Sequence, residues 1–283
     1  MVTEAALAVV GVTVRFGGVC ALEGVTLAVG PGEVLGLMGP NGAGKTTLFN
    51  VICGFVRPTS GHVERAGKPI RPVPHRLTRL GIARTVQGVG LWKGLTVVEN
   101  VMTGARPRRP RHAGSRPWQA DSRPWHAGST PWQAGSRPWH AERALTNRAR
   151  DLLGRLGLSA YADHLPATLP YGVQKRVALA RALASEPSIL VLDEPASGLS
   201  VDEVDDLAQR LGTLSKQMAI LMVEHRVDLV MSVSHRVVVL DCGKVIATGS
   251  PEQVRTDPKV ISAYLGESPA PRGEPCPAPL GQR

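Results

Sequence analysis

Residues 39–46 read Gly-Pro-Asn-Gly-Ala-Gly-Lys-Thr, which fills the phosphate-loop pattern G-x-x-x-x-G-K-[ST] at every fixed position. The preceding run, Glu33–Met38, is short and mostly apolar, as a buried strand would be, and Thr46–Cys53 can continue as a helix. Glycines at such a turn let backbone N–H groups converge on phosphate oxygens, and the helix dipole adds positive potential. The segment therefore predicts a nucleoside triphosphate site on a fold that places a strand, a tight turn and a helix in this order.

The pattern gives separate roles to the residues of this loop. The Lys45 ammonium is expected to reach the β- and γ-phosphates, and the Thr46 hydroxyl is expected to hold Mg²⁺. The predicted nucleotide-binding residues of the loop are Gly39, Pro40, Asn41, Gly42, Ala43, Gly44, Lys45, Thr46 and Thr47. The alternative is a chance glycine-rich turn, and the strand and helix patterns on either side argue against it.

The bulk composition indicates a globular cytoplasmic protein. The chain has 283 residues, 43% of them apolar, which is enough for a well-buried core. No apolar run approaches the roughly 20 residues that span a bilayer, and the N-terminus lacks the pattern of a signal peptide. The four cysteines form no C-x-x-C pair and are interpreted as unpaired thiols in a reducing compartment: Cys20, Cys53, Cys242 and Cys276.

Strand and helix patterns alternate along the chain. Val- and Leu-rich runs at 7–16 and 19–29 indicate an antiparallel hairpin region ahead of the phosphate loop. Further strands are expected at 81–86, 189–192, 219–223, 237–240 and 244–247, with a loop at 57–61. Apolar residues at helical spacing predict helices around 145–156 and 173–183, and a capping box predicts a helix start at Ser250. The alternation predicts an α/β fold with a mainly parallel sheet.

A seven-residue repeat interrupts this pattern between 115 and 141, with Ser-Arg-Pro-Trp as its fullest form. The proline in every copy argues against a coiled coil. The formal net charge is +10, and the stretch from Arg106 to Arg143 carries +6 of it through eight arginines and two acids. We interpret 106–141 as a disordered insertion and 267–283 as a disordered Pro-rich tail. Contact of the repeat with anionic lipid or single-stranded nucleic acid, or metal binding by His126 and His140, stays open.

Polar residues follow three further predicted strands. Asp193 and Glu194 end the apolar run 189–192, Gln87 follows 81–86, and His225 comes just after 219–223. In open α/β sheets, ligands bind at the carboxyl ends of the strands, so these side chains are expected to meet Lys45 there. In a phosphate-loop enzyme the first acid holds the Mg²⁺ shell, and the second orients or deprotonates the attacking water.

The order of these motifs, with Leu169–Val173 between Gln87 and Asp193, resembles the ATP-binding subunits of ABC transporters. The resemblance runs from about residue 7 to 266 apart from the repeat. Details at 15–18, 81–87, 95–101 and 257–266 are similar to the branched-chain amino acid importer branch. This resemblance implies one ABC ATPase domain over 1–266, with a phosphate-loop core, an antiparallel β region and a helical subdomain at about 92–180 that contains the insertion.

The resemblance also implies a site shared by two subunits. ATP would lie between the phosphate loop of one subunit and the signature segment of the other. Phe16 matches the aromatic that stacks on adenine, and Tyr171 and Gly172 match signature residues. Three residues match those that act at the γ-phosphate. Gln87 matches the residue that links the γ-phosphate and Mg²⁺ to the membrane subunit, Glu194 matches the general base, and His225 matches the γ-phosphate switch. The expected Mg²⁺ ligands are Thr46, Gln87 and Asp193.

The function implied is ATP hydrolysis that drives import of branched-chain amino acids, or related amides or urea, at the cytoplasmic face of a membrane. Such a subunit works with a second ATPase subunit, separate permeases and, indirectly, an external solute-binding protein; nucleic acid is not expected as a partner. One alternative is the ATPase of a lipid or polysaccharide exporter. Another is a soluble ABC ATPase acting on nucleic acid or ribosomes, which generally carries two ATPase units or a long coiled coil.

The signature segment departs from the family pattern. The family commonly has Leu-Ser-Gly-Gly-Gln, or Leu-Ser-Tyr-Gly-Gln in this branch, whereas residues 169–173 read Leu-Pro-Tyr-Gly-Val. Pro170 lacks the hydroxyl and the backbone N–H that would face the partner's γ-phosphate. The departure is either ordinary variation or a sign that the two ATP sites of the assembly differ in activity. The segment Ser197–Ser200 also lacks the Asp often found at its end, and no role is assigned to it.

Overall fold

The computed structural model describes residues 5–86, 88–105 and 138–265. Gln87, the part of the insertion at 106–137 and the tail at 267–283 lie outside the described residues, as does Cys276. Among the described cysteines, Cys20, Cys53 and Cys242 form no disulfide.

The centre of the molecule is a six-stranded sheet in the order β10-β9-β3-β8-β7-β6. Five of its strands run parallel, and β10 pairs antiparallel with β9 at one edge. The bounds are β3 Val34–Met38, β6 Ile82–Arg84, β7 Ile189–Asp193, β8 Ala219–Val223, β9 Arg236–Asp241 and β10 Lys244–Gly249. This confirms the predicted mainly parallel sheet.

A second, antiparallel sheet has the order β2-β1-β4-β5. Its strands are β1 Leu7–Phe16, β2 Val19–Val29, β4 Ser60–Arg65 and β5 Lys68–Ile70. Strands β1 and β2 confirm the predicted hairpin. The predicted end of the loop at 57–61 is wrong, because Ser60 pairs with Thr13 of β1 and is the first residue of β4.

Helix α1 (Lys45–Ile52) packs between the two sheets. Alternate residues of the buried strands serve opposite faces of the large sheet: Ile189 and Val191 pack toward α1, whereas Leu190 and Leu192 face the other helices. Those helices are α2 Val97–Gly104, α3 Pro138–Arg155, α4 Tyr171–Leu183, α5 Val201–Ser215 and α6 Val227–Val233, followed by α7 Pro251–Arg255 and α8 Pro258–Leu265. Short 3₁₀ helices lie at Pro74–Leu80, Ser159–Tyr161 and Pro166–Thr168.

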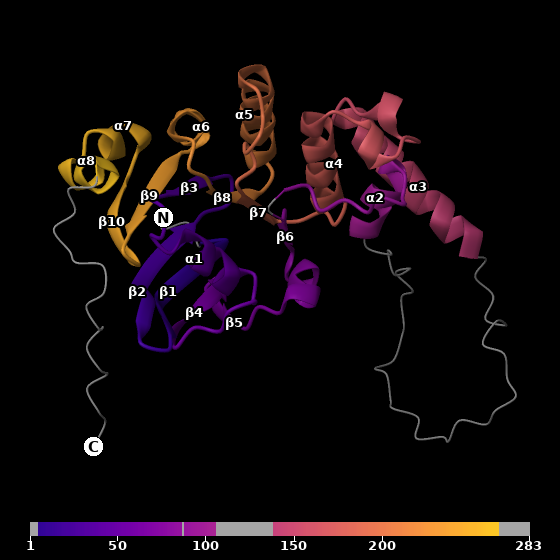
Figure 1. Cartoon of the computed structure of the whole chain (residues 1–283). Helices are drawn as coiled ribbons and strands as arrows, with labels where there is room; N and C mark the ends of the chain where they lie inside the picture. The colour runs from indigo at the N-terminus through magenta and orange to yellow at the C-terminus, as the bar shows by residue number, and fades with distance from the viewer. Residues whose placement is uncertain (1–4, 87, 106–137, 266–283) are drawn as a thin grey trace, which may run out of the picture.

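Figure 1 shows α2, α3 and α4 grouped at one end of the molecule and α7 and α8 at the other. The helices expected around 145–156 and 173–183 correspond to α3 and α4, and α7 begins with the predicted capping box at Ser250. The strand expected at 81–86 is shorter, since β6 ends at Arg84. Helix α3 begins at Pro138, inside the stretch assigned to the insertion, because proline is tolerated in the first turn of a helix.

Candidate active site

The phosphate loop connects β3 to α1 through three glycines in conformations that disfavour side chains. Gly39 has φ +151°, and a Cβ there would lie 2.0 Å from the Leu240 carbonyl oxygen. Gly44 has φ +100° and would place a Cβ 2.7 Å from the Ala21 carbonyl oxygen, while Gly42 has φ +83°. No side chain caps the first turn of α1. The loop therefore presents backbone N–H groups at a helix N-terminus, as an anion site requires.

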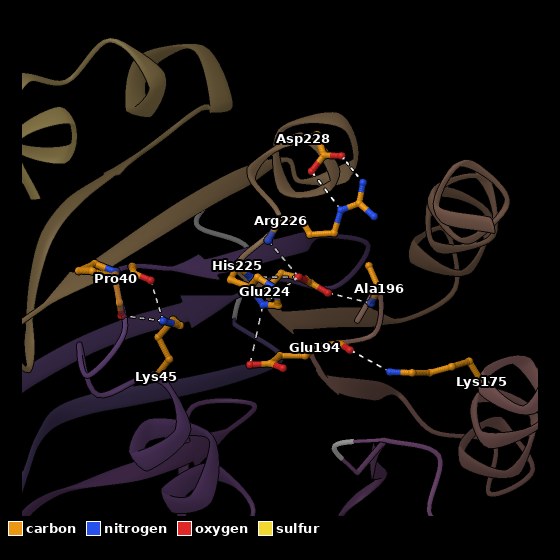
Figure 2. Close-up of polar contacts among 10 residues, drawn as sticks. Pro40, Lys45, Lys175, Glu194, Ala196, Glu224, His225, Arg226 and Asp228 are labelled. Atoms are coloured by element: carbon orange, nitrogen blue, oxygen red, sulfur yellow. Dashed lines mark hydrogen bonds and ion pairs between the residues drawn. The ribbon is translucent and has the colours of Figure 1, made fainter. Parts of the chain in front are cut away.

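Lys45 folds back over this loop. Its Nζ donates hydrogen bonds to the carbonyl oxygens of Gly39 at 2.6 Å and Pro40 at 2.8 Å (Figure 2). Burial lowers the pKa of Lys45, and the charge of Glu194 acts in the opposite direction. The ammonium is thus held at the mouth of the loop, within electrostatic range of the acid that follows β7.

Asp193, the last residue of β7, and Glu194, which follows it, lie in different environments. Burial raises the pKa of Asp193, the Glu194 charge raises it further, and the Arg84 guanidinium opposes both. Glu194 sits in a tight turn with φ +44°, and its N–H donates to the Val223 carbonyl oxygen of β8 at 2.9 Å. A non-glycine residue at such a φ is uncommon and is retained where surrounding bonds hold it.

His225 faces this acid from the end of β8. Its Nδ1 lies 3.9 Å from Glu194 Oε1 and 3.8 Å from Glu224 Oε2 (Figure 2). The imidazole is half exposed, with 52% of its side-chain surface accessible. The predicted meeting of polar side chains at the carboxyl ends of β3, β7 and β8 is thus seen in the structure for Lys45, Asp193, Glu194 and His225.

Glu224 organises the site and was not among the predicted residues. It is fully buried, and its carboxylate accepts backbone N–H bonds from Ala196 at 2.8 Å, His225 at 2.9 Å and Arg226 at 3.1 Å. It therefore ties the turn after β7 to the turn after β8 (Figure 2). The only sequence signal was a charged residue directly after an apolar strand, which does not reveal which way it points.

A second missed residue lies where the C-terminal helix approaches the loop. Burial raises the pKa of Tyr264, on α8, and the nearby Gly39 backbone acts in the opposite direction. Helix α8, at the far end of the described chain, therefore approaches the start of the phosphate loop.

The predicted residues on other elements lie apart from this cluster. Phe16 ends β1 with half of its surface exposed, so its ring is available for stacking. Tyr171 and Gly172 begin α4, where a Cβ on Gly172 would collide with Glu203 of α5. Among the described contacts neither residue touches the phosphate loop, so their expected role depends on another subunit.

Pro170 serves as the N-cap residue of α4 without a side-chain cap. Its carbonyl oxygen accepts from the Gln174 N–H at 3.0 Å, so the helix starts normally despite the departure from the family pattern. One turn later Lys175, whose pKa burial lowers, donates from Nζ to the Glu194 carbonyl oxygen at 3.1 Å (Figure 2). The signature segment is thus linked through α4 to this chain's own Glu194.

A cavity of about 270 Å³ lies between α4 and α5, at Asp193. Its lining includes Thr85, Asp193, Leu179 and Leu207. Lys45 is not among its lining residues. The nucleotide site is therefore identified by the loop geometry and not by this cavity.

Comparison with known proteins identifies the family. Residues 22–197 match the family described as "ABC transporter", and residues 244–270 match "Branched-chain amino acid ATP-binding cassette transporter". The high-affinity branched-chain amino acid transport ATP-binding protein BraF of Pseudomonas aeruginosa is 40% identical over 93% of this chain and 98% of its own length. LivG of Escherichia coli K12, which has the same description, is 36% identical over 93% of this chain and 98% of its own length. The lipopolysaccharide export system ATP-binding protein LptB of Haemophilus influenzae is 33% identical over 86% of this chain and 90% of its own length.

Solved structures agree with this assignment. The ADP conformation of the ATP-binding cassette MJ1267 has a TM-score of 0.75 at 30% identity and covers 93% of this chain and 100% of its own. A dimeric post-hydrolysis state of the cassette MJ0796, bound to ADP and phosphate, has a TM-score of 0.65 at 25% identity and covers 87% and 98%. No helix within the described ranges is long and apolar enough to cross a membrane. The chain belongs to the ABC transporter family, as an ATP-hydrolysing cassette of the branched-chain amino acid transport type.

Proposed function

We propose that this chain is the ATP-hydrolysing subunit of an importer for branched-chain amino acids or for related amides or urea. The observation that carries the proposal is the convergence of Lys45, Glu194 and His225 at the carboxyl edge of the parallel sheet. The higher identity to BraF than to LptB, together with the match at 244–270, supports import over lipopolysaccharide export.

The geometry supports a division of the hydrolytic roles among these residues. The loop backbone and Lys45 bind the phosphates, and Glu194 takes a proton from the water that attacks the γ-phosphorus as the bond to ADP breaks. His225, 3.9 Å from Glu194, contacts the γ-phosphate and orients that acid. The oxygen donors Thr46 and Asp193, with Gln87, suit Mg²⁺. When bound, Mg²⁺ neutralises charge on the β- and γ-phosphates.

The site is completed by a second ATPase subunit. Phe16 stacks on adenine from the same chain, while Tyr171 and Gly172 serve the partner's nucleotide. The dimeric ADP-bound cassette MJ0796 supports this arrangement. Pro170, which has no N–H to donate, makes the signature of this chain the weaker one, so the two ATP sites differ in activity if the partner is a different protein.

The other partners are separate permease subunits and, through them, an external solute-binding protein. In this proposal the chain lies peripherally on the cytoplasmic face of the membrane, which is supported by the description of its relatives BraF and LivG as transport ATP-binding proteins. Nucleic acid is not a partner in this proposal.

Uptake in cells tests the proposal directly. A strain lacking this gene, complemented with the wild-type chain, should accumulate radiolabelled leucine, and Lys45→Ala should abolish the gain. Arg150→Met, which removes only an exposed ion pair with Asp163, should complement normally. Parallel uptake of labelled urea and acetamide identifies the solute class. Unchanged uptake of all three on loss of the gene would contradict the import function.

The difference between the two ATP sites has its own test. Glu194→Gln in this chain and the corresponding change in the partner are placed separately in the assembled transporter. The two variants are expected to lose different fractions of the ATPase activity. Equal losses would contradict a difference between the two sites.

A further inference from the structure

Exposed cations gather on the segment that joins α1 to β6. Residues 57–84 contain seven arginines and lysines and a single acid, Glu64, for a net charge of +6. The whole chain carries +10 and the stretch from Arg106 to Arg143 carries +6, so the remainder of the chain is net negative. Five of the seven cationic side chains are exposed, and we call them the basic patch: Arg57, Lys68, Arg71, Arg76 and Arg79.

The basic patch has no acidic neighbour that neutralises it. Among the described residues, none of its five side chains forms an ion pair or a side-chain hydrogen bond. The one acid of the segment, Glu64, is half-buried, and its Oε1 lies 2.8 Å from Nε2 of His62. By comparison, the exposed Arg150 on α3 pairs with Asp163 at 2.6 Å. The positive charge of the basic patch is therefore available to an outside partner.

Two parts of this segment bring like charges together. In the hairpin of β4 and β5, Arg65 lies directly opposite Lys68, and like charges in that position destabilise a hairpin. Arg76 and Arg79 are three residues apart in the 3₁₀ helix Pro74–Leu80, a spacing at which side chains eclipse each other. An anionic partner would relieve both repulsions, whereas a neutral surface would not.

Packing contacts join these parts into one surface. The Arg65 Nη2 nitrogen lies at the end of the 3₁₀ helix, where a Cβ on Gly81 would be 3.2 Å from it. A Cβ on Gly54, in the turn that leads to Arg57, would collide with the Pro72 backbone. Figure 1 shows β4 and β5 together on the side of the molecule opposite α5 and α6. The basic patch therefore belongs to one continuous side of the structure.

The surroundings of the basic patch distinguish among anionic partners. Single-stranded nucleic acid binds in grooves that offer aromatic faces for base stacking. Phe55, two residues before Arg57, already carries the Arg84 guanidinium 4.4 Å from its ring centroid. No patch residue lines the cavity at Asp193 or the cavity of about 410 Å³ beside α3. A layer of lipid phosphates needs clustered charge but neither a groove nor stacking, so it fits this surface better.

We propose that the basic patch binds the anionic phospholipid headgroups of the membrane on which this chain works. The inference rests on the proposed function only for the location of the chain at a membrane surface. The patch turns the side of β4 and β5 toward the bilayer and adds a lipid contact to those with the permeases. Among the described contacts, no patch residue touches the phosphate loop or the acids after β7, so hydrolysis without lipid should not depend on it.

Co-sedimentation of the full chain with lipid vesicles tests this proposal. The vesicles contain phosphatidylcholine alone or mixed with phosphatidylglycerol, and the wild-type chain should bind the anionic vesicles and bind them less at high salt. The variant carries Arg71→Gln, Arg76→Gln and Arg79→Gln together. Each cation near an anionic surface strengthens binding about fivefold, so the triple variant should have a partition coefficient about a hundredfold lower.

Two control variants separate the patch from the net charge. Lys216→Gln, Arg255→Gln and Lys259→Gln together remove the same charge from exposed positions on or next to α5, α7 and α8. This control should keep the partition coefficient within about threefold of the wild type, because these sites are remote from the patch. Replacing the three patch arginines by lysine retains the charge and should retain binding. If the triple variant unfolds, Arg76→Gln alone carries the test, with an expected loss of about fivefold.

Hydrogen–deuterium exchange locates the contact. Anionic vesicles should slow amide exchange at 66–80 about threefold in the wild type and not in the triple glutamine variant. The proposal would be overturned by equal losses of binding in the two triple variants, by unchanged exchange at 66–80, or by an RNA oligonucleotide that protects 66–80 as strongly as the vesicles do. Failure of the import function would appear instead in the leucine uptake assay, since vesicle binding needs neither permease nor solute.

Discussion

Replacing Glu224 by glutamine tests whether one buried carboxylate holds the two catalytic turns together. The carboxylate accepts three backbone N–H bonds, from Ala196 on one oxygen and from His225 and Arg226 on the other. A glutamine amide keeps one accepting oxygen and turns an NH₂ group toward a donor. In its better orientation it preserves the bonds to residues 225 and 226 and loses the bond to Ala196.

The expected magnitude follows from this count. A hydrogen bond to a charged group contributes about 1.5–3 kcal/mol, and relief from burying a charge offsets part of the loss, so Glu224→Gln should cost about 2 kcal/mol of unfolding free energy. For a domain of this size that corresponds to a fall of about 4–8 °C in Tm. Glu224→Ala leaves all three N–H groups without the acceptor and should cost about 4 kcal/mol. Because His225 loses its support, kcat should fall about tenfold in the glutamine variant.

Thermal unfolding and steady-state ATPase measurements check these values. Asp228→Asn is the matched control, since it also converts a carboxylate to an amide but breaks only the exposed ion pair with Arg226, worth about 0.5 kcal/mol or less. A Glu224→Gln protein with a Tm within about 1 °C and a kcat within about twofold of the wild type would show that this carboxylate does not hold the two turns together. So would an equal effect of Asp228→Asn.

Three further predictions concern a thiol, a glycine and a metal ligand. Burial raises the pKa of the Cys53 thiol from 9.0 to about 12. The contribution of this thiol to the free energy of unfolding is therefore complete below pH 9 and is lost as pH rises toward 12. In urea unfolding at a series of pH values, Cys53→Ala should reduce the fall in unfolding free energy between pH 9 and 12. Gly39→Ala should weaken ATP binding at least about hundredfold by calorimetry, because its Cβ would lie 2.0 Å from the Leu240 carbonyl oxygen; Gly42→Ala, with nothing within 4 Å, should be milder. Burial raises the pKa of Asp193, and Mg²⁺ needs the carboxylate, so apparent Mg²⁺ affinity should fall as pH drops toward that raised pKa and lose this dependence in Asp193→Asn.

Local pattern was sufficient for the parts of the fold that a short window determines. The phosphate loop, the hairpin at 7–29 and the capping box at Ser250 depend on residues close in sequence, and all three were predicted. Placement of Lys45, Asp193, Glu194 and His225 at one sheet edge followed from the rule that parallel strands end together.

Long-range contacts account for what the sequence did not reveal. Glu224 matters because its carboxylate reaches Ala196, 28 residues earlier in the chain. The start of β4 at Ser60 is set by pairing with Thr13 of β1, and Tyr264 of the last described helix lies near the Gly39 backbone. None of these partners leaves a periodic signal in the sequence, so the sequence alone could not identify them.

Glu194 is proposed as the general base of an ATP site built on the phosphate loop. Phosphate release and ATP binding measured side by side for Glu194→Gln in the assembled transporter test this role. Removal of a general base predicts a fall in turnover of at least about a hundredfold, with ATP affinity within about twofold of the wild type. Turnover that stays at the wild-type rate would show that Glu194 is not the general base.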